Sequence, residues 1–67
     1  MQIWINGKQN DFESDSMKIA DLVSILNLTG KRIAIEQNGE IVPRSLYAQT
    51  QLNNGDKLEI VGAVGGG

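Results

Sequence analysis

The sequence predicts a single α+β domain, residues 1–67, in which one helix packs against one face of a small mixed sheet. Three observations support this class. Runs of alternating apolar residues lie near both ends of the chain, two Asn-Gly pairs stand where strands would reverse direction, and a stretch between them has the apolar spacing of a helix. A chain of 67 residues has room for one compact core and little room for a deep pocket.

The N-terminal segment predicts a hairpin. Residues 1–5 alternate in polarity, and Asn6-Gly7 is a strong signal for a two-residue turn. Residues 9–13 then form the returning strand, which is polar apart from Phe12 and is therefore expected at an edge of the sheet.

A helix is expected next. Residues 14–16 (SDS) have the composition of a helix cap, and Asn27 and Gly30 mark the end of the helix. Between these signals the apolar residues recur at i, i+3, i+4 and i+7, which places in one stripe Ile19, Leu22, Val23 and Leu26.

The second half predicts three more strands. Residues 33–37 form a strand, a second Asn-Gly turn follows, and residues 40–42 form a short strand that ends at Pro43. The segment 44–51 is weakly patterned, and a single turn is expected to direct Leu46 and Tyr47 inward.

After a loop at residues 53–56, the last strand spans residues 57–61. If it pairs beside the first strand, it lies in the centre of the sheet, and the residues after it are attached to a rigid strand. The expected core then comprises Ile3, Ile5, Ile19, Leu22, Val23, Leu26, Leu58 and Ile60.

The composition restricts the possible functions. The chain has no Cys and no His, so it lacks the commonest nucleophile and the commonest general base, and an enzyme is not expected. No metal site is expected either. The six basic residues are scattered along a chain of net charge −2, which argues against a nucleic-acid partner. No apolar run is long enough for a membrane span and no signal peptide is present, so a cytoplasmic location is expected.

The glycine-rich ending is the most informative motif. Residues 62–67 (GAVGGG) hold four of the eight glycines, and they follow directly after the last strand. Glycine has no Cβ, so Gly65, Gly66 and Gly67 would pass through a narrow channel and present a carboxylate to another protein. We therefore expect residues 62–67 to be a flexible tail. The glycines do not cradle a nucleotide, because no helix N-terminus or Lys follows them.

The chain resembles the sulfur carrier proteins of thiamine biosynthesis, the ThiS family, from end to end. The resemblance is carried by Asn6-Gly7, by residues 33–45 (IAIEQNGEIVPRS), by the Asn-Gly-Asp loop at residues 54–56 and by residues 58–67 (LEIVGAVGGG). It implies the ubiquitin-like β-grasp fold.

The resemblance also implies a chemistry. In that family a partner uses ATP and a metal to adenylate the C-terminal glycine carboxylate, here Gly67, which is then converted to a thiocarboxylate. The thiocarboxylate gives its sulfur to thiazole synthase. The implied partners are an ATP-dependent adenylyltransferase, a sulfur donor protein and thiazole synthase, and the carrier itself holds no cofactor.

The residues expected to contact partners are Trp4, Arg44, Val61 and Val64. Trp4 alternates away from Ile3, so it is expected on the sheet face opposite the helix, where Val61 could extend the same docking patch. Core burial explains Trp4 equally well, and a solvated turn explains Arg44.

Other functions share the same ending. A sulfur carrier like the small subunit of molybdopterin synthase has the same tail chemistry. A ubiquitin-like modifier would instead form an isopeptide with lysine. A third alternative is an interaction module with an inert tail.

Overall fold

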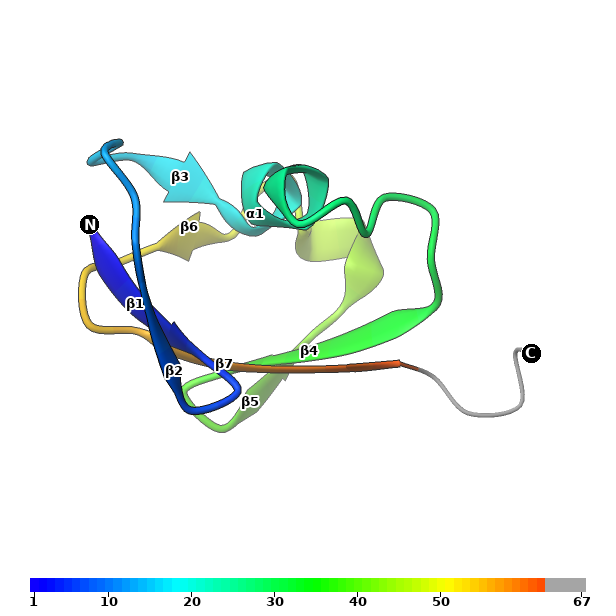
Figure 1. Ribbon diagram of the computed structural model, residues 1–67. Coiled ribbons are helices and arrows are strands. Elements are labelled where there is room, and N and C mark those ends of the chain that lie inside the picture. Colours follow the sequence, from blue (N-terminus) through cyan, green and yellow to red (C-terminus); the bar gives the residue numbers. More distant parts are fainter. Residues whose placement is uncertain (63–67) are drawn as a thin grey trace.

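The computed structural model of the protein describes residues 1–62, which form a five-stranded sheet, a two-stranded sheet and one α-helix (Figure 1). The helix lies on one side of the large sheet, and none of the described elements covers the opposite face. In chain order the elements are β1 (Gln2–Ile5), β2 (Lys8–Asp11), β3 (Met17–Lys18), α1 (Ile19–Ile25), β4 (Ile33–Gln37), β5 (Glu40–Val42), the 3-10 turn η1 (Arg44–Leu46), β6 (Gln51–Leu52) and β7 (Lys57–Gly62). The predicted α+β class, with one helix on one face of a mixed sheet, is confirmed.

Strand β7 lies in the middle of the large sheet, whose order is β2-β1-β7-β4-β5. It runs parallel to β1, with Ile5 opposite Leu58, and antiparallel to β4, with Ile35 opposite Ile60. The predicted pairing of the last strand beside the first is therefore confirmed.

Both predicted Asn-Gly turns are present. Asn6 and Gly7 connect β1 to β2 with φ values of 51° and 81°, and Asn38 and Gly39 connect β4 to β5 with φ values of 52° and 87°. Two consecutive positive φ values are typical of the type I′ turn, whose twist matches that of the strands it joins. Asn and Gly are the residues that tolerate this backbone conformation best, so the local sequence fixes both hairpins.

The helix begins later than the sequence predicts, and residues 14–16 do not cap it. The Ser14 hydroxyl donates to the Ser16 carbonyl at 2.6 Å and accepts from the Ser16 N–H at 3.2 Å, which forms a separate tight turn. The helix starts after Lys18, whose backbone N–H donates to Oδ2 of Asp21 at 2.9 Å. A carboxylate inside the first turn thus takes over part of the capping role and also suits the positive end of the helix dipole.

The helix ends where Asn27 predicts. Asn27 has a φ of 62°, its N–H donates to the Ser24 carbonyl at 3.0 Å, and the N–H of Leu28 donates to the Val23 carbonyl at 2.9 Å. This pair of bonds is the Schellman motif, which satisfies carbonyls that the end of a helix leaves free. The chain is thereby turned toward β4.

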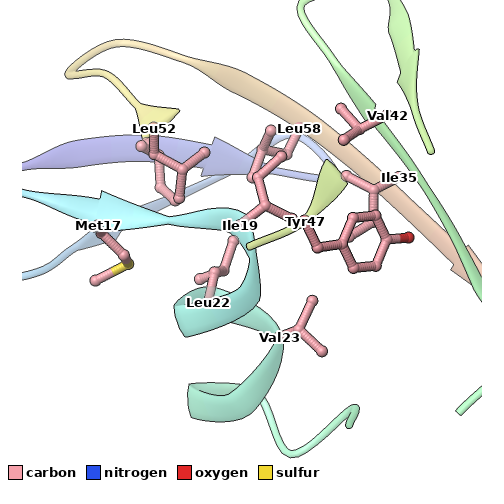
Figure 2. Close-up of a cluster of buried hydrophobic side chains, with 10 residues drawn as sticks. Met17, Ile19, Leu22, Val23, Ile35, Val42, Tyr47, Leu52 and Leu58 are labelled. Atoms are coloured by element: carbon pink, nitrogen blue, oxygen red, sulfur yellow. The ribbon is translucent and has the colours of Figure 1, made fainter. Parts of the chain in front are cut away.

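Side chains from α1 and both sheets form one core (Figure 2). Part of the predicted core is buried, namely Ile3, Ile19, Leu22, Val23 and Leu58. The other predicted members, Ile5, Leu26 and Ile60, are partly buried and pack against it. Leu26 is the C-cap residue, directly after the last residue of α1, so the predicted stripe extends to the end of the helix.

The segment around η1 buries one apolar residue instead of two, and this residue, Tyr47, directly follows the turn. Tyr47 is 9% exposed, as expected for an inward side chain, whereas Leu46 is 42% exposed. Adjacent residues of a 3-10 turn point about 120° apart, so both cannot face the core. The prediction for Leu46 is therefore wrong.

The small sheet is absent from the sequence prediction. Its strands β3 and β6 are antiparallel, with Met17 opposite Leu52, and both of these side chains are buried in the core. This sheet closes the end of the core beside the start of α1 (Figure 1).

Candidate functional site

The candidate site begins at the end of β7, which leads into the glycine-rich segment. Ala34 lies opposite Val61 and Ile33 opposite Gly62, so β4 supports the last two residues of the strand. The register with β1 ends at Leu58, and within residues 1–62 no strand pairs with Val61 and Gly62 on that side. The end of β7 is thus held along one edge and accessible along the other.

Asn6 fastens β7 just before this point. Its side chain donates from Nδ2 to the Ile60 carbonyl at 2.9 Å and accepts from the Ile60 N–H at 2.7 Å, while its backbone N–H donates to the Leu58 carbonyl at 2.8 Å. These three bonds continue the β1–β7 pairing past the end of β1. Asn6 therefore serves both the type I′ turn and the support of β7, a role that the Asn-Gly signal alone does not indicate.

The other end of β7 is anchored by Asp56. The carboxylate is buried and accepts hydrogen bonds from Gln37 Nε2 at 2.8 Å, from Asn38 Nδ2 at 3.0 Å and from the Asn53 N–H at 2.8 Å. Burial acts to raise the pKa of Asp56, but the bonds from Asn38, Asn53 and Gln37 outweigh it and hold the pKa below its ordinary value. The ionised carboxylate therefore ties the β4–β5 turn to the loop before β7.

Four of the predicted site residues lie outside the described part of the chain. Val64, Gly65, Gly66 and Gly67 belong to residues 63–67, so their roles remain predictions.

Trp4 and Val61 lie on the sheet face opposite the helix, which we call the outer face. Trp4 is half-buried and pairs with Lys57, whereas Val61 is 57% exposed and lies four residues further along β7. Four residues of strand span roughly 13 Å, and Glu59 points to the same face between them. Trp4 and Val61 therefore do not form one continuous patch.

Val61 has other apolar neighbours on the outer face. Ala34 lies directly opposite it on β4, and Ile41 on β5, 64% exposed, lies opposite Glu36 and diagonally from Ala34. We call Ala34, Ile41 and Val61 the outer apolar patch. Neither Ala34 nor Ile41 was predicted as a site residue, although the alternation of Ile41 with the buried Val42 was the available signal.

Arg44 lies apart from the outer apolar patch. It is the first residue of η1, it is exposed, and its Nη2 donates to the Lys31 carbonyl at 3.2 Å. This bond links η1 to the segment between α1 and β4, so Arg44 has a structural contact and also lines a surface hollow.

The described residues offer neither a metal site nor a membrane-spanning helix. Residues 1–62 contain no cluster of His, Cys, Asp or Glu suited to a metal ion. Within the same range, no helix has the length and apolar character needed to cross a membrane.

The arrangement of one helix on a mixed sheet with β1 and β7 as parallel central neighbours defines a ubiquitin-like β-grasp protein. The crystal structure of the thiamine biosynthesis protein ThiS from Geobacter metallireducens superposes with a TM-score of 0.88 at 29% identity, covering 100% of both chains. The model of the ThiS family matches residues 3–67. The chain belongs to the ThiS family.

Curated relatives agree with this assignment. The chain is 36% identical to the sulfur carrier protein ThiS of Bacillus subtilis over 94% of this chain and 96% of that protein. It is also 48% identical to part of a thiazole synthase from Paramagnetospirillum magneticum, and there it spans only 20% of the relative's length. A thiazole synthase from Magnetococcus marinus shows the same relation, with 30% identity over 20% of its length.

Proposed function

We propose that this protein is a sulfur carrier of thiamine biosynthesis that acts through the terminal carboxylate of Gly67. A carboxylate is a poor electrophile, so the carboxylate of Gly67 first attacks the α-phosphate of ATP, which releases pyrophosphate and leaves an acyl adenylate. A persulfide sulfur of a donor protein then displaces AMP and forms an acyl disulfide. A thiol attacks the donor's sulfur, which forms a new disulfide with the donor and releases the thiocarboxylate. The thiocarboxylate passes its sulfur to thiazole synthase.

The observation that carries this proposal is the ThiS family match, which extends from residue 3 through the glycines to residue 67. The central position of β7 supports it, because a strand held between β1 and β4 gives the reactive end a firm base. The relatives that are thiazole synthases support thiazole synthase as the acceptor.

The chain acts as a substrate of other enzymes and not as a catalyst. It contains no Cys and no His, so an adenylyltransferase supplies the ATP, the metal ion and the catalytic groups. The sulfur travels on the main-chain terminus, and a thiol in the carrier is unnecessary. Because adenylation draws on ATP, we place the protein in the cytoplasm.

Partners dock on exposed apolar residues near the reactive end. Val61, together with Ala34 and Ile41, lies on the outer face at the end of β7, and Trp4 offers a second, separate contact on β1. Val64 and the glycines after it then enter the active site of the partner.

The decisive experiment is the intact mass of the protein after incubation with the activating enzyme, ATP and a sulfur donor. We expect one terminal oxygen to be replaced by sulfur. An unchanged mass, under conditions where Bacillus subtilis ThiS reacts, would refute the proposal. Heavier conjugates on a denaturing gel would instead indicate a protein modifier.

A substitution in the tail tests the access argument. Gly66→Ala adds a Cβ in the narrow channel of the partner, so we expect slower adenylation with a nearly unchanged melting temperature. The control is Ala48→Gly, at an exposed position. A glycine such as Gly39 cannot serve as the control, because its positive φ would strain an alanine and change the stability of the fold. Equal adenylation rates for Gly66→Ala and the unmodified chain would remove the channel argument.

A further inference from the structure

Two adjoining hollows lie on the helix side of the sheet, beside the end of β7. Their volumes are about 290 Å³ and 440 Å³, and both are lined by Leu28, Lys31 and Ile33. The larger hollow reaches Gly62, which was predicted to begin the flexible tail but is the last residue of β7. Because they share three residues, we treat them as one feature and call it the basic groove.

The groove has an apolar floor. Leu26, Leu28, Ile33 and Ile60 contribute to it, and all four are partly buried side chains packed against the edge of the core. The Schellman turn at Asn27 creates this surface, because it directs Leu28 back along the helix toward Val23. The groove thus offers a preformed site for an apolar side chain.

The rim of the groove is positively charged. Lys31, Arg32 and Arg44 line it, and all three are exposed. No Asp or Glu among residues 1–62 lines either hollow, although the chain as a whole has a net charge of −2. Half of the six basic residues therefore gather here, and the expectation that they are scattered is wrong for these three.

We propose that the basic groove binds an acidic segment of thiazole synthase that places an apolar side chain on the floor and carboxylates at the rim. The proposal rests on the proposed function, because it concerns the enzyme that accepts the sulfur. Rim charges speed the encounter of two proteins more than they strengthen the complex, which suits a carrier that has to leave after each transfer. The groove adjoins the outer apolar patch at Val61, which also lines the larger hollow, so a segment bound in the groove would lie beside the docking residues at the end of β7.

The test measures the affinity of the full-length carrier for thiazole synthase by titration calorimetry at low and at high salt. We expect Lys31→Glu/Arg32→Glu to raise Kd by about tenfold or more at low salt and to reduce the salt dependence of binding. Lys18→Glu is the matched control, since it reverses an exposed charge at the other end of α1, and there we expect less than about a twofold change. Melting curves establish that all variants fold.

Each result decides the proposal. An unchanged Kd for the folded double variant overturns it, and so does an equal loss for Lys18→Glu. A double variant that is adenylated slowly but binds thiazole synthase normally assigns the groove to the activating enzyme instead. Concentration-dependent dimers that the double variant abolishes would assign the groove to a second copy. Failure of thiocarboxylate formation in the unmodified chain, read by intact mass, would refute the proposed function and not the groove.

Discussion

At the scale of single residues, Asp56 has the most unusual environment. It is the one charged side chain that is buried among residues 1–62, and its three hydrogen bonds come from the β4–β5 hairpin and from the loop before β7. A buried charge without partners is costly, so the Gln37 and Asn38 side chains are as necessary as the carboxylate. The loop at residues 53–56, which the sequence predicts only as a connection, is thus held to the β4–β5 turn by the Asp56 carboxylate.

Asp56→Asn tests the contribution of these hydrogen bonds to stability. The amide keeps the shape of the side chain but replaces one oxygen by an NH2 group, which faces the donor of Asn38 or those of Gln37 and Asn53, so we expect a loss of about 1–3 kcal/mol of stability at neutral pH. Urea unfolding monitored by circular dichroism measures it. Asp15→Asn, at an exposed position, is the control and is expected to be nearly neutral.

The same residue predicts a dependence on pH. The pKa of Asp56 is lowered in the folded state, so its stabilising contribution is present above the ordinary pKa of a carboxyl group and is lost as the pH falls through the folded value. We expect unmodified protein to lose more stability than Asp56→Asn between neutral pH and acid below about pH 4. Parallel losses for the two proteins would contradict the role of the ionised carboxylate.

Trp4 allows fold and docking to be separated. It is half-buried on the outer face, so Trp4→Ala should leave the protein folded while weakening binding to the activating enzyme or thiazole synthase by on the order of 1–2 kcal/mol or more. Calorimetric titrations alongside melting curves measure both effects. Complete unfolding of Trp4→Ala would place Trp4 in the core and remove it from the docking surface.

At the scale of elements, α1 is short and depends on packing more than on helix propensity. It has seven residues, fewer than an isolated helix needs in water, and its buried side chains are Ile19, Leu22 and Val23. Its start is fixed by the hydrogen bond that Asp21 accepts from the Lys18 N–H, and its end by the two bonds of the Schellman motif at Asn27. The helix therefore depends for its stability on packing against the sheet.

Leu22→Ala measures this dependence. The side chain is fully buried, so we expect a loss of about 2–5 kcal/mol, which is a large share of the stability of so small a domain. Ile25→Ala is the matched control on the same helix, because Ile25 is 56% exposed. Similar losses in denaturant unfolding would mean that the helix packs on a different face.

The elements that the sequence predicts are those with a local signal. The two Asn-Gly turns and the stripe of α1 were predicted correctly, because a type I′ turn and a helix are determined by neighbouring residues. Strands β3 and β6 were missed, because two residues are too few to show alternation, and their pairing joins positions 33 and 35 residues apart. The cap at residues 14–16 was wrong for the same reason, since β3 separates that turn from the helix.

At the scale of the whole molecule, the candidate site was predictable only in part. Strand alternation was enough to place Trp4 and Val61 on the outer face. The basic groove was not predictable, because Lys31 and Arg44 are far apart in the chain and meet only when η1 packs beside the segment after α1. No periodicity within either segment carries that information.

Truncation tests how the molecule divides into body and tail. A chain ending after Gly62 keeps every described strand, so we expect its melting temperature to match that of the full chain and its sulfur-accepting activity to be lost. A chain ending after Asp56 lacks β7 and should be unfolded by circular dichroism, because the β1–β2 and β4–β5 hairpins then have no strand between them. If the chain that ends after Asp56 were folded, this result would refute the central role of β7.

The position of β7 also bears on how the protein is made. β7 follows every other described element in the chain, yet both halves of the large sheet pair with it. During translation the hairpins emerge first, and the sheet cannot close until residues 57–62 have left the ribosome. A polypeptide whose synthesis stops before residue 57 therefore stays unfolded and open to proteases, so under the proposed function it does not occupy the sulfur-transfer enzymes as a folded domain that lacks the terminal glycine.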